Sequence, residues 1–253
     1  MDIAVITGAS SGMGREFVLA LDKQQELDEI WVIARREQRL LELKDQCRAR
    51  IVPLVLDLTD PDSPKAYEKK LQEEQPRIKV LVNGAGYGLF GEFTALPRDE
   101  QLDCITVNDR ALTAFTYISL PYMEPGSQIY NIGSMSSFQP TPYMCVYAAS
   151  KAFVLSFTRA INVELEQRGI SAMAVCPGWI KTDFFDRAVR DDTIKYYNRY
   201  YTAEQVIRQA LIDMKKGRDV SVLGGPEKRQ VWLVKHLPHR LVMRTWCKQQ
   251  GKK

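Results

Sequence analysis

The chain has only two histidines, no Cys-x-x-Cys pair and no long apolar run. Its five cysteines are scattered and odd in number, which argues against both a disulfide framework and a zinc site. His236 and His239 have basic neighbours and no nearby carboxylate, so we expect no metal there. No stretch approaches the ~18 apolar residues of a membrane span, and the short lead of Met1 and Asp2 leaves no room for a signal peptide. We therefore expect a cytoplasmic protein.

The sequence also has no feature that would mark a boundary between domains. No Gly/Ser-rich or Pro-rich linker, low-complexity run or repeat divides its 253 residues, so we expect a single domain. The net charge of +4 is unevenly distributed, because the segment from Glu227 to the end has eight Lys or Arg and one acid. The rest of the chain is therefore slightly acidic. Since nucleic-acid binding requires a basic surplus, we expect no nucleic-acid partner.

Short apolar or β-branched runs alternate with amphipathic helical patterns along most of the chain. This alternation predicts an α/β fold with one doubly wound, Rossmann-like parallel sheet of about seven strands flanked by helices. Ligands of such sheets bind outside the carboxyl ends of the strands. The predicted strands are residues 3–6, 30–34, 52–56, 80–82, 128–132, 172–175 and 220–223.

A glycine-rich turn follows the first predicted strand and opens a helix. Residues 7–14 read Thr-Gly-Ala-Ser-Ser-Gly-Met-Gly. Glycines let the backbone approach a pyrophosphate, which then lies at the helix N-terminus, where free N–H groups favour an anion. The turn therefore predicts dinucleotide contacts from Gly8, Ser10, Ser11, Gly12, Met13 and Gly14.

The end of the second strand indicates which nucleotide is bound. Ala34 stands where an NAD-selecting enzyme usually has an acid, and Arg35 and Arg36 follow it. Guanidinium groups suit bidentate contact with a phosphate. We therefore predict NADP(H) over NAD(H), with Arg35 favoured and Arg36 next. The alternative is a solvated helix start in which Glu37 pairs with these arginines.

Tyr147 and Lys151 are four residues apart, a spacing that puts both on one face of a helix. A nearby ammonium group favours the phenolate, so we expect the pKa of Tyr147 to fall below its usual value of ~10. The phenol could then both give and take a proton. Ser134, at the end of an apolar run, could hold a substrate oxygen beside it.

These motifs together resemble the short-chain dehydrogenase/reductase family, which has a serine thirteen residues before Tyr-x-x-x-Lys, as in Ser134, Tyr147 and Lys151. The resemblance covers roughly residues 3–225. It implies hydride transfer between NADPH and a ketone or secondary alcohol. It also implies that Asn108 is a fourth catalytic residue, which helps to hold a water that relays protons from the lysine. Further cofactor contacts are implied for Asp57, Leu58, Asn83, Ala85, Gly86, Tyr147, Lys151, Pro177, Gly178, Ile180 and Thr182.

Two positions leave alternatives open. Asp57 either contacts the adenine, as the family resemblance implies, or caps the helix that follows Pro61. Gly84 replaces the second asparagine of the Asn-Asn-Ala-Gly motif that the family uses, so the stabilising role of that amide is missing here.

The substrate region is rich in aromatic residues, and residues 184–201 correspond to the family's variable lid. A largely apolar pocket predicts a bulky lipophilic carbonyl or alcohol, for example hydroxysteroid-like. The alternatives are a 3-oxoacyl reductase of lipid metabolism and a catalytically silent NADP-sensing or scaffold protein. Any one aromatic residue could equally belong to the core or a subunit contact. The expected substrate contacts are Tyr87, Ser134, Phe138, Tyr143, Tyr147 and Phe184.

We assign residues 1–225 to the catalytic nucleotide-binding region and residues 226–253 to a basic amphipathic extension, split by Pro238 into two short helices. Such helices either pack on the body or a second subunit, which we favour, or lie as a peripheral contact on an anionic membrane. The family resemblance also implies a homodimer or homotetramer.

Overall fold

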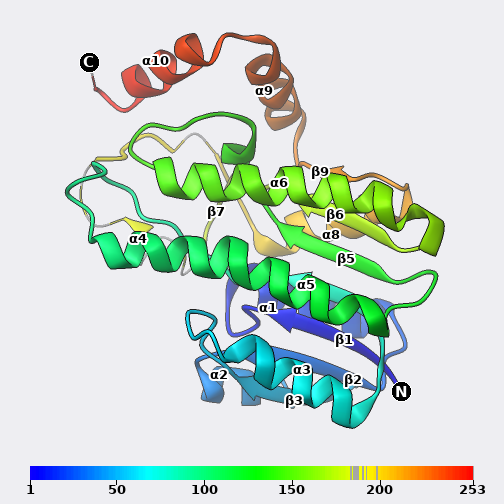
Figure 1. The fold of residues 1–253 in the computed structure, drawn as a ribbon. Coiled ribbons are helices and arrows are strands. Elements are labelled where there is room, and N and C mark those ends of the chain that lie inside the picture. The colour runs from blue at the N-terminus through cyan, green and yellow to red at the C-terminus, as the bar shows by residue number, and fades with distance from the viewer. Residues whose placement is uncertain (183, 185–187, 190, 192, 198, 253) are drawn as a thin grey trace.

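A computed structural model describes residues 1–182, 184, 188, 189, 191, 193–197 and 199–252. Seven parallel strands form one sheet in the order β3-β2-β1-β4-β5-β6-β9, which confirms the predicted doubly wound α/β fold (Figure 1). The strands are β1 (Asp2–Thr7), β2 (Glu29–Ala34), β3 (Arg50–Val55), β4 (Arg77–Asn83), β5 (Gln128–Ile132), β6 (Ser171–Val175) and β9 (Val220–Ser221).

Helices cover both faces of this sheet (Figure 1). The α-helices are α1 (Gly12–Gln24), α2 (Glu37–Leu41), α3 (Ser63–Glu74), α4 (Arg98–Ile105), α5 (Leu112–Ser119), α6 (Cys145–Leu165), α8 (Ala203–Lys215), α9 (Gly225–His236) and α10 (His239–Gln249). The shorter helical turns are η1 (Thr106–Ala111), η2 (Leu120–Tyr122), η3 (Met135–Phe138) and η4 (Glu166–Arg168).

The core consists of two apolar layers, one on each face of the sheet. Phe17 of α1 packs on Tyr130 of β5, with ring centroids 5.0 Å apart, and α8 belongs to the same layer. On the other face, Tyr67 of α3 stacks on Phe115 of α5 at 4.6 Å. Because both faces are buried, the strands carry near-continuous apolar residues, which is why they could be predicted.

The order of the strands reverses direction between β1 and β4, which lie side by side in parallel. The loops that follow these two strands diverge, so they leave a crevice at the carboxyl edge of the sheet. The Thr7 hydroxyl accepts hydrogen bonds from the N–H groups of Gly84 and Ala85, each at 3.1 Å. This joins the ends of β1 and β4 at the base of the crevice.

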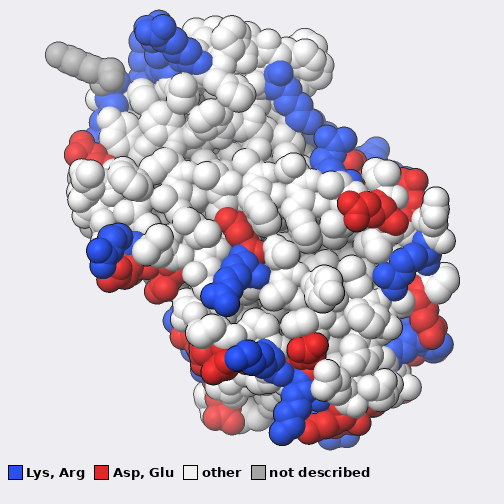
Figure 2. All heavy atoms as spheres, viewed as in Figure 1, with Lys and Arg blue, Asp and Glu red and all other residues white. Residues whose placement is uncertain are grey.

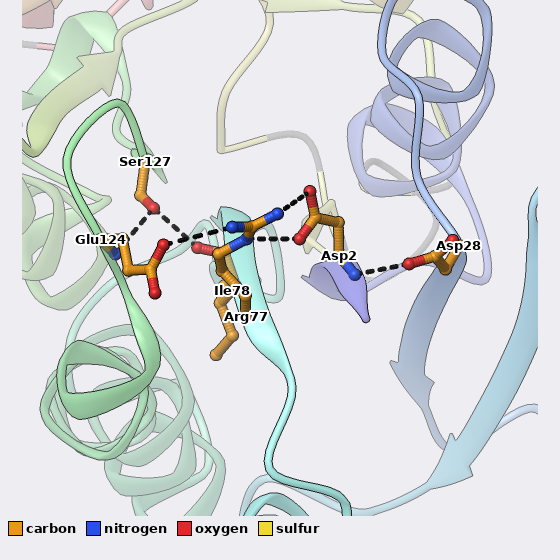
Figure 3. Close-up of polar contacts among 6 residues, drawn as sticks. All are labelled: Asp2, Asp28, Arg77, Ile78, Glu124 and Ser127. Carbon is orange, nitrogen blue, oxygen red and sulfur yellow. Dashed lines mark hydrogen bonds and ion pairs between the residues drawn. The ribbon is translucent and has the colours of Figure 1, made fainter.

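The opposite, amino edge of the sheet is joined by ionic contacts (Figure 3). Arg77, at the start of β4, forms a two-pronged pair with the Asp2 carboxylate and a further contact of 3.4 Å with Glu124. The N–H of Asp2 donates to Asp28 at 2.7 Å. These groups are partly solvated, so each pair contributes at most about 1 kcal/mol.

Two helices at the end of the chain, α9 and α10, lie at the top of Figure 1, beyond α6 and the edge strand β9. Val231 and Val234 of α9 and Val242 of α10 bury their side chains against Phe138. Among the described residues, no helix is long and apolar enough to cross a membrane. A second small sheet, formed by β7 (Trp179–Ile180) and β8 (Tyr200–Tyr201), was not predicted, because two-residue strands leave no sequence pattern.

Candidate active site

The glycine turn has the backbone shape that a phosphate cradle requires. Gly8 and Gly12 adopt left-handed φ angles of 70° and 54°, which disfavour other residues. A Cβ atom on Gly14 would collide with the carbonyl group of Gly8. Ser11 precedes α1 but places no side-chain hydrogen bond on its first turn. The helix therefore presents its N–H groups toward the turn, as an anion site needs.

The two arginines after β2 point to different partners. The guanidinium of Arg36 donates to the hydroxyls of Ser10 at 3.0 Å and Ser11 at 2.6 Å, at the edge of the glycine turn. Arg35 instead lies 3.6 Å from the carboxylate of Asp57. The structure thus puts Arg36, rather than the favoured Arg35, against the phosphate-binding turn.

Asp57 does not cap the next helix, because α3 begins at Ser63 with Asp62 as its N-cap. Its carboxylate accepts hydrogen bonds from the backbone and hydroxyl of Thr59 at 3.0 and 2.9 Å. Burial raises the pKa of Asp57, but these hydrogen bonds and the charge of Arg35 outweigh it and hold the pKa below its usual range. The group is therefore ionised at neutral pH.

Of the other residues predicted to contact the cofactor, some line the cavity and others are buried in the core. The side chain of Asn83 is buried and donates to Thr116 at 3.0 Å and to Asn131 at 2.8 Å, so its amide stays inside the protein. Leu58 is also buried in the core. The residues that line the cavity described below are Met13, Gly86, Tyr147, Lys151, Pro177, Gly178, Ile180 and Thr182.

Ser134 follows β5, which ends at Ile132, and is the N-cap of the helical turn η3, where it forms a reciprocal cap with Ser137. Its hydroxyl accepts from the N–H of Ser136, while the hydroxyl of Ser137 accepts from the N–H of Ser134, each at 3.1 Å. A Cβ atom on Gly133 would lie 2.9 Å from the sulfur of Cys176. This close packing fixes the direction in which the Ser134 side chain leaves the sheet.

Tyr147 and Lys151 lie one turn apart in α6, as predicted from their spacing. The Lys151 ammonium lies 5.8 Å from the centre of the Tyr147 ring and donates to the carbonyl of Ile132 at 2.8 Å. The Tyr147 ring packs against Phe90, and a Cβ atom on Gly88 would lie only 2.5 Å from it. Both side chains are thus held in single positions.

The predicted acidity of Tyr147 is wrong in this structure. Burial raises the pKa of Tyr147 to about 12, although a hydrogen bond with Ser134 opposes the rise. Burial likewise lowers the pKa of Lys151 to about 8. Moving a phenolate out of water costs more free energy than its attraction to the neighbouring ammonium group recovers. Burial also makes the amine itself harder to protonate. The phenol therefore holds its proton at neutral pH.

Asn108 occupies a π-helical turn, η1, between α4 and α5, a distortion often found at functional sites. Its amide donates to the carbonyl of Tyr87 and the hydroxyl of Ser150, each at 2.9 Å. A Cβ atom on Gly86 would lie 2.9 Å from the Asn108 amide oxygen and 3.1 Å from the Lys151 nitrogen. Asn108 and Lys151 therefore border the same small space.

Asp109 was missed by the sequence analysis, although it directly follows Asn108. One of its carboxylate oxygens is buried without a hydrogen-bond partner among the described residues. Burial raises the pKa of Asp109 to about 6, while the charge of Lys151 opposes the rise. Its only signal in the sequence is an acid in an otherwise weakly charged helical stretch.

A cavity of about 480 Å³ joins the reactive residues to the glycine turn. Ser134, Tyr147 and Lys151 line it together with residues from the ends of β4, β5 and β6. Of the described lid residues in 184–201, Phe184, Tyr196 and Arg199 line it, and the 5.5 Å spacing of the rings puts Phe184 beside Tyr147. Residues 185–187, 190, 192 and 198 of the predicted lid lie outside the described residues.

Three residues expected at the substrate lie elsewhere. The phenol of Tyr87 donates to the carbonyl of Glu100 at 2.8 Å, and its ring packs in the core. Phe138 packs under α9 and α10, where Lys235 lies 4.8 Å from its ring centre. Tyr143 packs around the cavity wall without lining it. Counting aromatic residues could not reveal which way each side chain points.

The C-terminal helices supply much of the cavity wall, which the sequence analysis did not assign. Their apolar stripe was visible in the sequence, but not the surface that it covers. The indole N–H of Trp246 donates to the carbonyl of Pro142 at 3.0 Å, and the Gln250 amide oxygen accepts from two backbone N–H groups of residues 195–196. The lining residues from α9, α10 and the turn between them are Glu227, Gln230, Leu233, Val234, Leu237, Leu241, Val242, Thr245, Trp246 and Gln249.

The sequence model of the short chain dehydrogenases matches residues 2–193. The chain belongs to the short-chain dehydrogenase family. This short-chain dehydrogenase is 34% identical over 195 residues to sulfoacetaldehyde reductase 2 of Chromohalobacter salexigens, covering 72% of this chain and 74% of that one. It is 30% identical over 217 residues to the NADP-dependent 3-hydroxy acid dehydrogenase of Schizosaccharomyces pombe, covering 83% of each.

The family assignment is matched by solved structures. A short-chain dehydrogenase from Sphingobium yanoikuyae, solved with NADPH, superposes with a TM-score of 0.78 at 28% identity, covering 98% of this chain and 94% of that one. This chain is therefore an oxidoreductase of the short-chain dehydrogenase family. The match of the family model ends at residue 193, before the helices that complete the cavity.

Proposed function

We propose that the chain is an NADP(H)-dependent oxidoreductase that transfers hydride between NADPH and a bulky, lipophilic ketone or secondary alcohol. The observation that carries this proposal is the shared cavity. Ser134, Tyr147 and Lys151 line it beside Gly86 and the segment that begins at Pro177. A carbonyl held there would lie within reach of both a proton donor and the nicotinamide.

The residues at the carboxyl edge fit a phosphorylated dinucleotide. The glycine turn leaves a cradle that side chains would fill, and a Cβ atom on Gly12 would already meet Thr182 at 3.4 Å. Arg36, held by Ser10 and Ser11, would contact the 2′-phosphate that distinguishes NADP from NAD. The name of the fission-yeast relative and the NADPH complex of the Sphingobium enzyme support the same preference.

When bound, NADPH supplies the hydride that reduces the carbonyl carbon. Ser134 holds the carbonyl oxygen by a hydrogen bond, and the protonated phenol of Tyr147 donates its proton to that oxygen as the charge develops. Lys151 and Asn108 border the space behind the phenol, where they hold a proton path that restores Tyr147. The protonated phenol serves carbonyl reduction as the proton donor, and the same group accepts the proton when the alcohol is oxidised.

The substrate class follows from the cavity wall. Met135 and Met144 from the body and several aliphatic residues of α9 and α10 make its outer part apolar. The cavity of about 480 Å³ includes the positions assigned to the nicotinamide, so the substrate class rests on this apolar outer wall and not on the volume. These features favour a bulky hydrophobic carbonyl, hydroxysteroid-like in size, over a small polar one.

A second candidate is an anionic carbonyl, since sulfoacetaldehyde and 3-hydroxy acids, named for two relatives, both carry a negative charge. Arg199 lines the cavity and could meet such a group. Against this, Arg199 lies 4.0 Å from the buried carboxylate of Glu227, which also lines the cavity and offsets its charge. An anionic 3-oxoacyl substrate falls in the same class.

We also propose that the chain assembles as a homodimer or homotetramer through α4, α5 and α6; α4 and α5 run end to end beside α6 in Figure 1. Exposed apolar residues occur on each of these helices, among them Ile105, Tyr117 and Phe153. Phe153 stacks on Phe157 at 5.8 Å and extends this surface along α6. Such a patch favours self-association.

The proposed function is tested by a panel of bulky ketones, steroid ketones, 3-oxoacyl thioesters and small sulfonated or carboxylated aldehydes, each with NADPH and with NADH. We expect NADPH oxidation with the bulky ketones and little with NADH. Turnover only of the anionic compounds would select the second candidate. Tight NADPH binding without oxidation by any compound would instead identify a silent sensor.

A further inference from the structure

The helices α9 and α10 carry exposed apolar residues that nothing in the described structure covers. Trp232 is 60% exposed and Leu241 is 50% exposed, which are large fractions for such side chains. Leu233 and Leu237 are exposed as well, although both also line the cavity. Leu233, Leu237 and Leu241 are both exposed and cavity-lining, so they lie at the cavity mouth, whereas Trp232 is next to Leu233 in α9 but does not line the cavity. We call these four residues the α9–α10 surface.

Cations flank this surface. On α10, Arg240 and Arg244 are one turn apart and so share one face, next to Leu241. On α9, Arg229 and Lys235 are exposed on either side of Trp232. In Figure 2, blue side chains border an uncharged surface at the upper end of the molecule, where Figure 1 places these helices.

Acidic residues do not offset this charge. The only acid in the segment from residue 227 to the end is Glu227. It is buried and accepts a hydrogen bond from the phenol of Tyr201 at 2.7 Å, so its charge is directed into the protein. A cationic helical surface with an exposed tryptophan and leucines has the composition that binds the boundary of an anionic bilayer.

We propose that the α9–α10 surface docks on an anionic lipid bilayer, with the cavity mouth facing the membrane. A second copy of the chain is the less suitable occupant, because two such surfaces would bring their cations together. The surface of α4–α6 has exposed apolar residues together with both acidic and basic ones, for example Asp99 and Arg110, so it suits a second copy better. The consequence for catalysis rests on the proposed function: a lipophilic carbonyl dissolved in the bilayer would enter between Leu233, Leu237 and Leu241 without crossing water.

The test is sedimentation of the full-length protein with vesicles of phosphatidylglycerol and phosphatidylcholine, compared with vesicles of phosphatidylcholine alone. We expect binding only to the anionic vesicles, weakening as salt rises. Trp232→Ser should weaken binding about tenfold, and the double variant Arg240→Glu/Arg244→Glu by more than tenfold. Neither change touches a residue of the reaction site, and vesicle binding requires no turnover, so a failure here leaves the proposed function untouched.

The matched controls make the same changes on another surface. Phe93→Ser removes an exposed aromatic residue from the loop before α4, and Lys65→Glu/Lys69→Glu reverses two exposed charges on α3. These variants should bind vesicles as the unmodified chain does. Absent binding, equal binding to neutral vesicles, or equal losses in controls and test variants would overturn the proposal. A vesicle-independent dimer that Trp232→Ser dissociates, without vesicle binding, would also overturn it in favour of a second copy.

Discussion

The two parts of the cavity are built in different ways. In the part matched by the family model, reactive side chains are fixed by hydrogen bonds to the sheet or its loops, as when Lys151 donates to Ile132. In the part contributed by α9 and α10, aliphatic side chains form the wall, and Trp246 and Gln250 are its polar anchors to the body. The first part sets the reaction, whereas the second can change the substrate without disturbing the chemistry.

The two parts should differ most in how much unfolding free energy is lost when a glycine gains a methyl group. Gly14→Ala would drive a Cβ atom into the backbone of Gly8 at the base of α1, so we expect a loss of about 3 kcal/mol or more in unfolding free energy. Gly225→Ala, at the start of α9, meets no atom within 4 Å and should stay within about 0.5 kcal/mol. Urea unfolding measures both, and similar values would contradict the comparison.

The difference between locally determined and tertiary features explains which parts of the fold and of the site could be predicted from the sequence. The glycine turn and the Tyr147–Lys151 pair depend on spacing within one element, so their placement was predictable. The pKa of Tyr147 was mispredicted because it depends on burial by distant residues such as Phe90. The π-helical turn at Asn108 and the packing of Trp246 against Pro142 leave no local pattern, because they arise from tertiary contacts.

A second prediction compares the contributions of Arg36 and Arg35 to cofactor affinity. Arg36→Ala should raise the Kd for NADPH about 10- to 100-fold, since a charged hydrogen bond contributes about 1.5–3 kcal/mol, and leave the Kd for NADH nearly unchanged. Arg35→Ala is the matched control, because Arg35 faces Asp57 instead of the turn. Fluorescence titration measures both dissociation constants. A larger effect of Arg35→Ala, or equal losses for both nucleotides, would reverse the assignment.

On the substrate side, Trp246→Phe keeps an aromatic ring but removes the N–H donor to Pro142. A lost hydrogen bond of about 1 kcal/mol should raise KM for a bulky ketone about fivefold, while kcat and NADPH affinity change little. Trp232→Phe alters a tryptophan that does not line the cavity, so it serves as the control with water-soluble substrates. A fall in kcat without a rise in KM would place Trp246 in the reaction itself.

An effect of similar, modest size concerns Asp109. Burial raises the pKa of Asp109 to about 6, above its usual 3.8, so the folded chain binds this proton more tightly than the unfolded chain. Stability should therefore fall as pH rises through this interval. Asp109→Asn should remove that fall and stabilise the protein above it by about 1–2 kcal/mol, a modest value because solvent screens part of the charge. Urea unfolding on both sides of the interval checks this, and an unchanged pH profile would contradict it.

The role of Tyr147 is the central claim, and a single-turnover experiment with the best ketone from the panel tests it most directly. Tyr147→Phe removes only the phenolic oxygen and keeps the ring against Phe90. We expect the rate of NADPH oxidation to fall about 10²- to 10⁴-fold, with NADPH affinity within about twofold of the unmodified chain. A rate close to that of the unmodified chain, with NADPH still bound, would contradict the account.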